Sequence, residues 1–168
     1  ILEFSFESAG GDLYFNFQFA SEEYNEYTNS SFNDVFGFFL DGTNIALIPG
    51  TSTPVSINNV NGGNPIGTNA SNSQFFNDND LSSGPPQFNI GYDGFTDLFT
   101  ASALNLSAGL HTIKLAIADV ADSILDLARV LAGGVAVAIA SGAGRGRAFP
   151  SVSVSVVDLS LKKKQPGR

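Results

Sequence analysis

Apolar and polar residues alternate along the start of the chain. Leu2, Phe4 and Phe6 are separated by charged or hydroxyl residues, and the run 13–19 carries apolar side chains at every odd position. A period of two places each apolar set on one face, so the pattern predicts two half-buried strands. Gly10-Gly11-Asp12 lies between them and predicts a hairpin turn.

Further short apolar runs separated by turn residues continue this pattern. Residues 35–40 are apolar on both faces, which favours a central strand, and residues 111–117 alternate clearly. Other predicted strands cover 45–48, 55–60, 88–92 and 95–101, with a last one around 152–156. The spacing indicates an all-β fold, an antiparallel β-sandwich of jelly-roll type that could be incomplete at both ends. Its expected core comprises Phe15, Phe17, Phe19, Phe36, Phe38, Ile113, Leu115 and Ile117.

Charge divides the chain into two parts. Residues 1–128 hold fifteen acidic residues and one basic residue, Lys114, whereas residues 129–168 hold seven basic residues and one acidic residue. An acidic region repels nucleic acid and anionic membrane and attracts divalent cations or basic partners. The plainer interpretation is a solvated acidic surface. Cysteine is absent, so disulfides and thiolate metal sites are excluded.

Composition predicts a boundary near Asp126. Nearly all Phe and every Asn precede residue 106, while 128–148 is low in complexity and a basic run, 162–164, leads into the end. The apolar part of 127–140 is shorter than the ~20 residues that a membrane span needs. We therefore expect one β-sandwich domain over 1–126 and an atypical segment with a basic tail over 127–168. A frameshifted C-terminus is one hypothesis for this change.

Several long motifs in order resemble the choice-of-anchor L domain family. They are FQFASEEYNEYTNSSFNDVFGFFLDG, NIALIPGTSTPVSINNVNGGNP, YDGFT and HTIKLAIADVADSILD. The resemblance runs from Ile1 to about Asp126 and implies a bacterial exported domain, at the cell surface or outside the cell, without known enzymatic activity. The usual first part of such a domain and any signal peptide are expected upstream of this fragment, and the family pattern is lost after Asp126.

Two acidic motifs predict a calcium site. In ADVADSILD, the spacing of Asp119, Asp122 and Asp126 would place three carboxylates on one helical face, where they repel one another. Calcium takes six to eight oxygen ligands and would relieve that repulsion. The predicted set joins them to the first acidic loop: Glu22, Glu23, Asp34, Asp119, Asp122 and Asp126. Adjacent Glu22 and Glu23 point to opposite faces if extended, so one of them joins a shared site more easily than both.

Ordinary structural roles compete with this prediction. Asp119 could cap a short helical turn, and the Asn and Asp residues of the first loop could hold it by side-chain bonds to backbone. A third oxygen-rich run, residues 77–80 (NDND), is more typical of a polar loop than of a metal site.

The remaining candidates concern sugars and catalysis. Tyr24, Tyr27 and Tyr92 are candidate ligand-binding residues because exposed rings could stack on sugars, whereas loop aromatics can also fold back onto the core. A Ser-His-Asp triad would need His111, whose inward position favours a satisfied core histidine. Paired carboxylates could serve a glycosidase, but two acids are easily found among fifteen. The sequence has neither a Gly-x-Ser-x-Gly elbow nor a phosphate-binding glycine loop in a strand-helix context.

The sequence thus favours a non-catalytic, exported β-sandwich domain that binds Ca²⁺ and takes part in adhesion to a surface glycan or matrix protein. A carbohydrate-binding module is the alternative, and a glycoside hydrolase ranks third.

Overall fold

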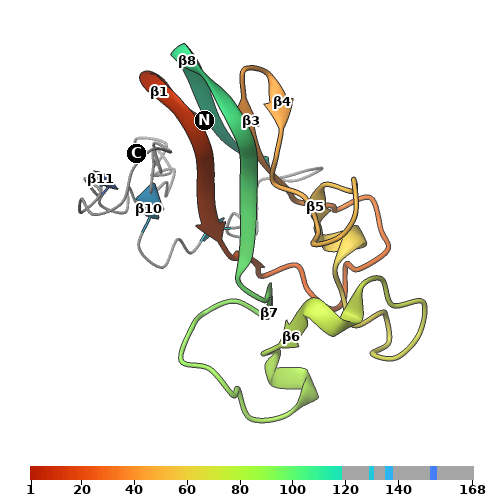
Figure 1. Cartoon of the computed structure of the whole chain (residues 1–168). Coiled ribbons are helices and arrows are strands. Elements are labelled where there is room, and N and C mark those ends of the chain that lie inside the picture. Colours follow the sequence, from red (N-terminus) through yellow and green to blue (C-terminus); the bar gives the residue numbers. More distant parts are fainter. Residues whose placement is uncertain (119–128, 131–134, 138–151, 155–168) are drawn as a thin grey trace, which may run out of the picture.

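The computed structural model shows an all-β domain with three short 3-10 turns (Figure 1). It describes residues 1–118, 129–130, 135–137 and 152–154. The strands are β1 (Leu2–Phe17), β2 (Phe19–Ser21), β3 (Val35–Leu40), β4 (Thr43–Asn44), β5 (Val55–Ser56), β6 (Phe76–Asp78), β7 (Gly94–Thr96), β8 (Phe99–Ala118), β9 (Arg129–Val130), β10 (Val135–Val137) and β11 (Val152–Val154). The 3-10 turns are η1 (Ile57–Asn59), η2 (Ser73–Phe75) and η3 (Leu81–Ser83).

These strands pair in antiparallel fashion throughout the described residues. One sheet has the order β1-β8-β3-β4, with β5 also paired to β3, and a second has the order β6-β7-β2-β9. β10 and β11 form a separate pair. The prediction of an all-β, antiparallel sandwich is therefore confirmed.

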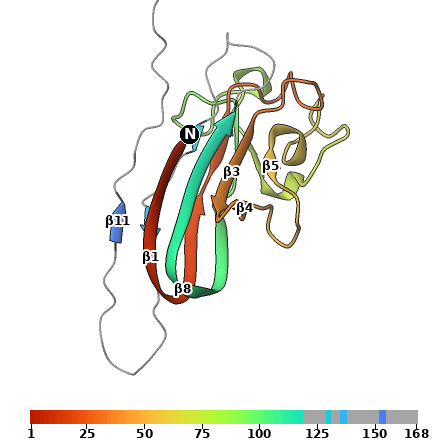
Figure 2. The same cartoon turned by 90° about the horizontal axis from the view of Figure 1, so that it is seen from above.

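The first sheet is built on a long two-stranded ribbon that folds back on itself. β1 and β8 pair from Leu2↔Leu115 to Phe17↔Phe99, and the register shifts by one residue between Gly11 and Leu13. Both strands bend in the middle, and Figure 2 shows the two arms of the ribbon lying one behind the other. Gly10 and Gly11 stand at the bend with positive φ values of 92° and 122°, which glycine adopts without a Cβ penalty.

The predicted hairpin at Gly10-Gly11-Asp12 is therefore wrong. The two alternating runs of the sequence are the two arms of a single strand, and each pairs with β8 rather than with the other. A glycine pair permits a sharp bend as readily as a reverse turn, and the partner strand lies about a hundred residues away along the chain.

The apolar faces of the two arms enclose one core. The Phe15 ring stacks on Phe38 of β3 at a centroid distance of 4.5 Å, and Phe17 lies 5.1 Å from Phe36. Six of the eight predicted core residues belong to this buried cluster, and the other two, Leu115 and Ile117, are partly buried and pack against it. The alternating pattern therefore identified the core correctly.

Some predicted strands are shorter than expected. The run 55–60 forms two strand residues and then η1, and residues 88–92 form bends rather than a strand. The strand expected around 152–156 is present as β11. None of the helical segments in the described ranges has the length and apolar character needed to cross a membrane.

Candidate functional site

The loop that follows β2 sends its two adjacent glutamates to different places. Glu23 is 2% exposed, whereas Glu22 is only half-buried and acts electrostatically on Asp93. This separation agrees with the expectation that one of the pair joins a shared site more easily than both.

Asp34 lies on the inner side of this loop. It is 1% exposed and accepts a hydrogen bond from the Ser21 hydroxyl at 3.2 Å, while the Ser21 oxygen accepts from the Glu23 amide at 3.0 Å. Burial raises the pKa of Tyr24, and the Asp34 charge raises it further, so the phenol stays neutral. These contacts are typical of an aspartate that holds a loop in place, which is the alternative to metal binding for Asp34.

A group of carboxylates gathers around Asp93 on the outer side. Burial, and to a smaller extent the charges of four neighbouring acids, together raise the pKa of Asp93 to about 6; these acids are Asp80, Glu26, Glu22 and Asp78. Because β6 pairs with β7 through Asp78↔Gly94, the residue after Asp93 lies directly opposite Asp78. We call these five acids the acidic cluster. It adjoins a cleft of about 620 Å³ lined by Asn25, Glu26, Asn64, Pro65, Ile66, Asp80, Ser82 and Ser83.

Asn25 connects the first loop to the acidic cluster. Its side chain is buried, and Nδ2 donates to Asp78 Oδ1 at 2.9 Å and to Asp80 Oδ2 at 3.4 Å. Asp80 is fixed in turn, because its oxygens accept from the Ser82 amide at 2.7 Å and the Ser82 hydroxyl at 2.8 Å. Several oxygen atoms therefore converge beside the cleft, which is the donor chemistry that Ca²⁺ prefers.

Carboxylates alone do not complete a metal site here. Within the described part of the chain, no group of three or more acidic, histidine or cysteine side chains forms a ready-made site. A cation at the acidic cluster would therefore need amide, hydroxyl, main-chain or water oxygens as additional ligands, which is common for Ca²⁺.

The predicted metal set is divided by the structure. Of its first-loop members, Glu22 belongs to the acidic cluster, and Glu23 and Asp34 lie inside. Asp119, Asp122 and Asp126 lie outside the described residues, so their convergence with the first loop stays a prediction. The run 77–80 supplies Asp78 and Asp80, which the predicted set omitted. The alternation of amide and carboxylate side chains in this run is the sequence signal that could have identified these two aspartates.

The predicted ligand-binding tyrosines are less accessible than expected. Tyr24 is completely buried and Tyr92 is 8% exposed, so the expectation of exposed rings is wrong for both. The Tyr24 ring packs between Phe19 and Phe76, because burying a large ring is favourable. Tyr27 is half-buried and its ring lies 5.0 Å from that of Phe32.

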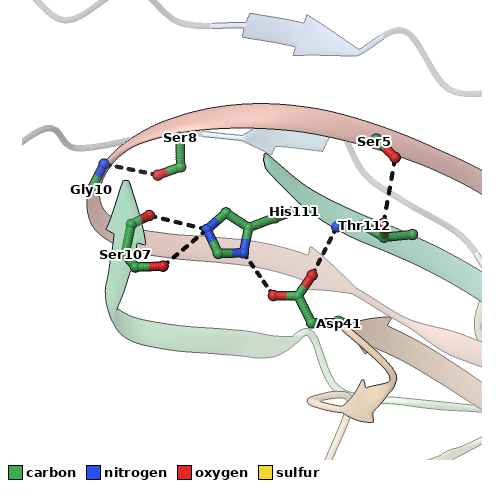
Figure 3. A network of polar contacts seen from close by, with 7 residues as sticks. All are labelled: Ser5, Ser8, Gly10, Asp41, Ser107, His111 and Thr112. Atoms are coloured by element: carbon green, nitrogen blue, oxygen red, sulfur yellow. Dashed lines mark hydrogen bonds and ion pairs between the residues drawn. The ribbon is translucent and has the colours of Figure 1, made fainter. Parts of the chain in front are cut away.

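His111 forms a second polar network at the bend of the ribbon (Figure 3). Its Nδ1 lies 2.6 Å from Asp41 Oδ2, and its Nε2 lies 3.0 Å from the Ser107 carbonyl and 3.4 Å from the Ser107 hydroxyl. Asp41 Oδ1 also accepts from the Thr112 amide at 2.8 Å. The network joins the turn after β3 to both sides of the bend in β8.

The Asp41–His111–Ser107 chain of contacts resembles a catalytic triad, but its hydrogen bonds differ from those of a triad. A carbonyl can only accept, so Nε2 must carry a proton toward Ser107, while Nδ1 donates to Asp41. The imidazole is then a cation without a lone pair to take the serine proton. Consistently, the hydrogen bond to Asp41 and that to the Ser107 backbone raise the pKa of His111. His111 is thus a satisfied core histidine, as the sequence favoured.

We expect the His111 network to make stability depend on pH. Because the His111 pKa is raised above 6.5, the protonated ring stabilises the fold fully below pH 6.5, and this stabilisation is lost as pH rises through the folded-state pKa. Hydrogen bonds from His111 and Thr112 lower the pKa of Asp41 below 3.8, so the stabilisation by the Asp41 carboxylate is lost only as pH falls below 3.8. The difference in melting temperature between wild type and His111→Gln should be largest between pH 4 and 6.5 and shrink in alkaline buffer. A difference independent of pH would contradict a charged His111.

Comparison with known proteins adds one match. The model of the Choice-of-anchor L domain family matches residues 1–135, which confirms the resemblance and extends past Asp126. No curated protein and no solved structure matches the chain significantly.

Proposed function

Because the chain belongs to the Choice-of-anchor L domain family, we propose that it is a non-catalytic surface domain that holds Ca²⁺ at its acidic cluster and mediates adhesion or matrix contact. Membership of this family implies a bacterial exported or cell-surface domain. The calcium site and the adhesive role are the proposal, and they rest on the chemistry of the loops beside β6 and β7.

One observation carries the calcium proposal. The acidic cluster gathers the carboxylates of Asp93 and four neighbouring acids, and two of them, Glu26 and Asp80, line the cleft. Lys114, the one lysine or arginine among residues 1–118, lies elsewhere, with its Nζ 4.0 Å from a Glu3 carboxylate oxygen on the first arm of the ribbon. Like charges gathered in a partly buried place repel one another, and a bound divalent cation offsets that repulsion. Irregular loops with mixed oxygen donors suit Ca²⁺ better than Mg²⁺, which requires a nearly ideal octahedron.

The proposed partner is a surface glycan or a matrix protein. A cation at the mouth of an open cleft keeps coordination positions for water, and hydroxyl or carboxylate oxygens of a partner could replace that water. The alternative, a carbohydrate-binding module that stacks sugars on tyrosine, is less well supported, because two of its three rings are buried.

Calcium should raise the melting temperature of the domain. A ligand that binds only the folded state stabilises it by mass action, by about 2.7 kcal/mol when free calcium exceeds Kd a hundredfold. The measurement is a thermal melt of the full chain in chelator, in CaCl₂ and in MgCl₂ at equal ionic strength.

Two charge-removing variants provide the matched comparison. Asp80→Asn should reduce the calcium response because Asp80 lines the cleft, whereas Glu7→Gln should leave it unchanged because Glu7 is an exposed residue near the bend of the ribbon. Identical melting temperatures in calcium and in chelator would contradict the proposal.

A further inference from the structure

The first sheet carries an aromatic ring on the face turned away from the core. Side chains alternate along β3, so Phe36 and Phe38 enter the core and Phe39 lies on the opposite face, where it is half-buried. Packing of the core explains the two inner rings. It does not explain why a third ring stands on the outer face.

Gly37 determines how that ring lies. A Cβ at this position would stand 2.5 Å from Phe39 Cε2 and 2.9 Å from Phe39 Cζ, so the ring leans over the glycine and lies along the sheet. Glycine weakens the interior of a strand, and its presence there often marks a place where another group approaches closely. Here the ring covers the sheet with one side and turns its other side outward.

A hollow of about 380 Å³ adjoins this ring. Its lining residues are Glu3, Phe39, Gly42, Thr112 and Lys114. The strand register pairs Lys114 with Glu3 on one side and with Phe39 on the other, so these three residues form a row across β1, β8 and β3. Ligand sites commonly measure about 300–1,000 Å³, so the hollow suits a small ligand or a short part of a longer one.

The polar groups of the hollow place a donor beside an acceptor. Lys114 Nζ lies 4.0 Å from Glu3 Oε2, beyond hydrogen-bond distance, and the two side chains are 42% and 55% exposed. The Thr112 hydroxyl lies in the next row, 3.4 Å from that of Ser5 (Figure 3). An ammonium group only donates and a carboxylate only accepts, whereas a hydroxyl does both. Two neighbouring hydroxyls of a ligand can therefore bridge Lys114 and Glu3.

We propose that this hollow binds a neutral glycan, with one pyranose ring stacked on Phe39 and two of its hydroxyls bound to Lys114 and Glu3. A pyranose with equatorial substituents, such as glucose or N-acetylglucosamine, presents axial C–H groups that pack on the negative face of an aromatic ring. The charges of Lys114 and Glu3 offset each other, so the hollow does not favour a charged sugar. This inference rests on the adhesive role in the proposed function, whose partner it names, but its site is separate from the acidic cluster and needs no calcium.

The test is titration of cellohexaose and of N-acetylated chitohexaose into the full chain in chelator, followed by calorimetry and by amide NMR spectra. Phe39→Leu keeps an apolar side chain but removes the ring, and it should weaken binding about 10-fold or more. Lys114→Met removes the donor and should also weaken binding. Phe4→Leu is the matched control and should bind as wild type does, because Phe4 is a 39% exposed ring that pairs with the buried Ile113 and points to the opposite face of the same sheet.

The wild-type spectra give a readout that does not depend on the folding of a variant. The Gly42 and Thr112 amide signals should shift on titration, because both residues line the hollow. Unchanged signals with both glycans at about 10 mM, or tighter binding of hexagalacturonate than of cellohexaose, would overturn the inference. Binding that requires calcium and persists in Phe39→Leu would also overturn it, while supporting the proposed function. The thermal melts in calcium test the acidic cluster separately.

Discussion

Replacing Phe17 by alanine is expected to lower the free energy of unfolding by about 3–5 kcal/mol. The Phe17 side chain is completely buried, and its ring lies 5.1 Å from Phe36 and meets the Phe99 ring edge-on at 5.8 Å. It therefore joins the second arm of the ribbon to β3. Its removal leaves a cavity among the packed rings of β1, β3 and β8, which can relax only partially to fill it. Urea unfolding of both proteins, followed by circular dichroism, measures the difference.

Phe4→Ala is the matched control for this prediction. Phe4 lies on the same strand but is 39% exposed, so the loss should be about 1 kcal/mol or less. Similar losses for Phe17→Ala and Phe4→Ala would contradict a core located between the two arms.

The sequence predicted the core because alternation is a local property. The odd positions of the run 13–19 and the apolar run 35–40 could be assigned to a buried face without knowing which strands pair. The same reasoning could not find the bend in β1. Whether Gly10 and Gly11 form a hairpin or a bend depends on β8, which follows about ninety residues later.

Only part of the acidic cluster could be predicted from the sequence. Glu22 of the first acidic loop acts electrostatically on Asp93 together with three other acids, and whether the cluster binds calcium stays a prediction. Asp78 and Asp93 were missed because the pairing of β6 with β7 brings them together, and no spacing in the sequence encodes that pairing. The buried position of Asn25 was equally hidden, since an amide in a polar loop normally faces solvent.

One wall of the cleft depends on a tight loop between Gly62 and Thr68. The Gly67 amide donates to the Gly62 carbonyl at 2.7 Å, and the Asn64 amide donates to the Thr68 carbonyl at 3.1 Å. The Asn64 side chain also donates to the Glu26 carbonyl at 2.7 Å, which ties this loop to the first acidic loop. Closure of the loop therefore positions both sides of the cleft.

Gly63→Ala should disrupt this loop far more than Gly67→Ala does. Both glycines have φ near +89°, so an alanine at either position costs about 1–2 kcal/mol of stability for adopting a left-handed conformation. At Gly67 a Cβ would meet no atom within 4 Å, whereas at Gly63 it would stand 2.2 Å from the Thr68 carbonyl oxygen. Overpacking against backbone adds about 1–3 kcal/mol, which brings the expected loss for Gly63→Ala to about 2–5 kcal/mol. Chemical unfolding measures both losses, and calcium titration should show weaker binding for Gly63→Ala only. Equal losses in the free energy of unfolding of the two variants would contradict this prediction, because they would mean that the loop accommodates the added Cβ and that its closure does not shape the cleft.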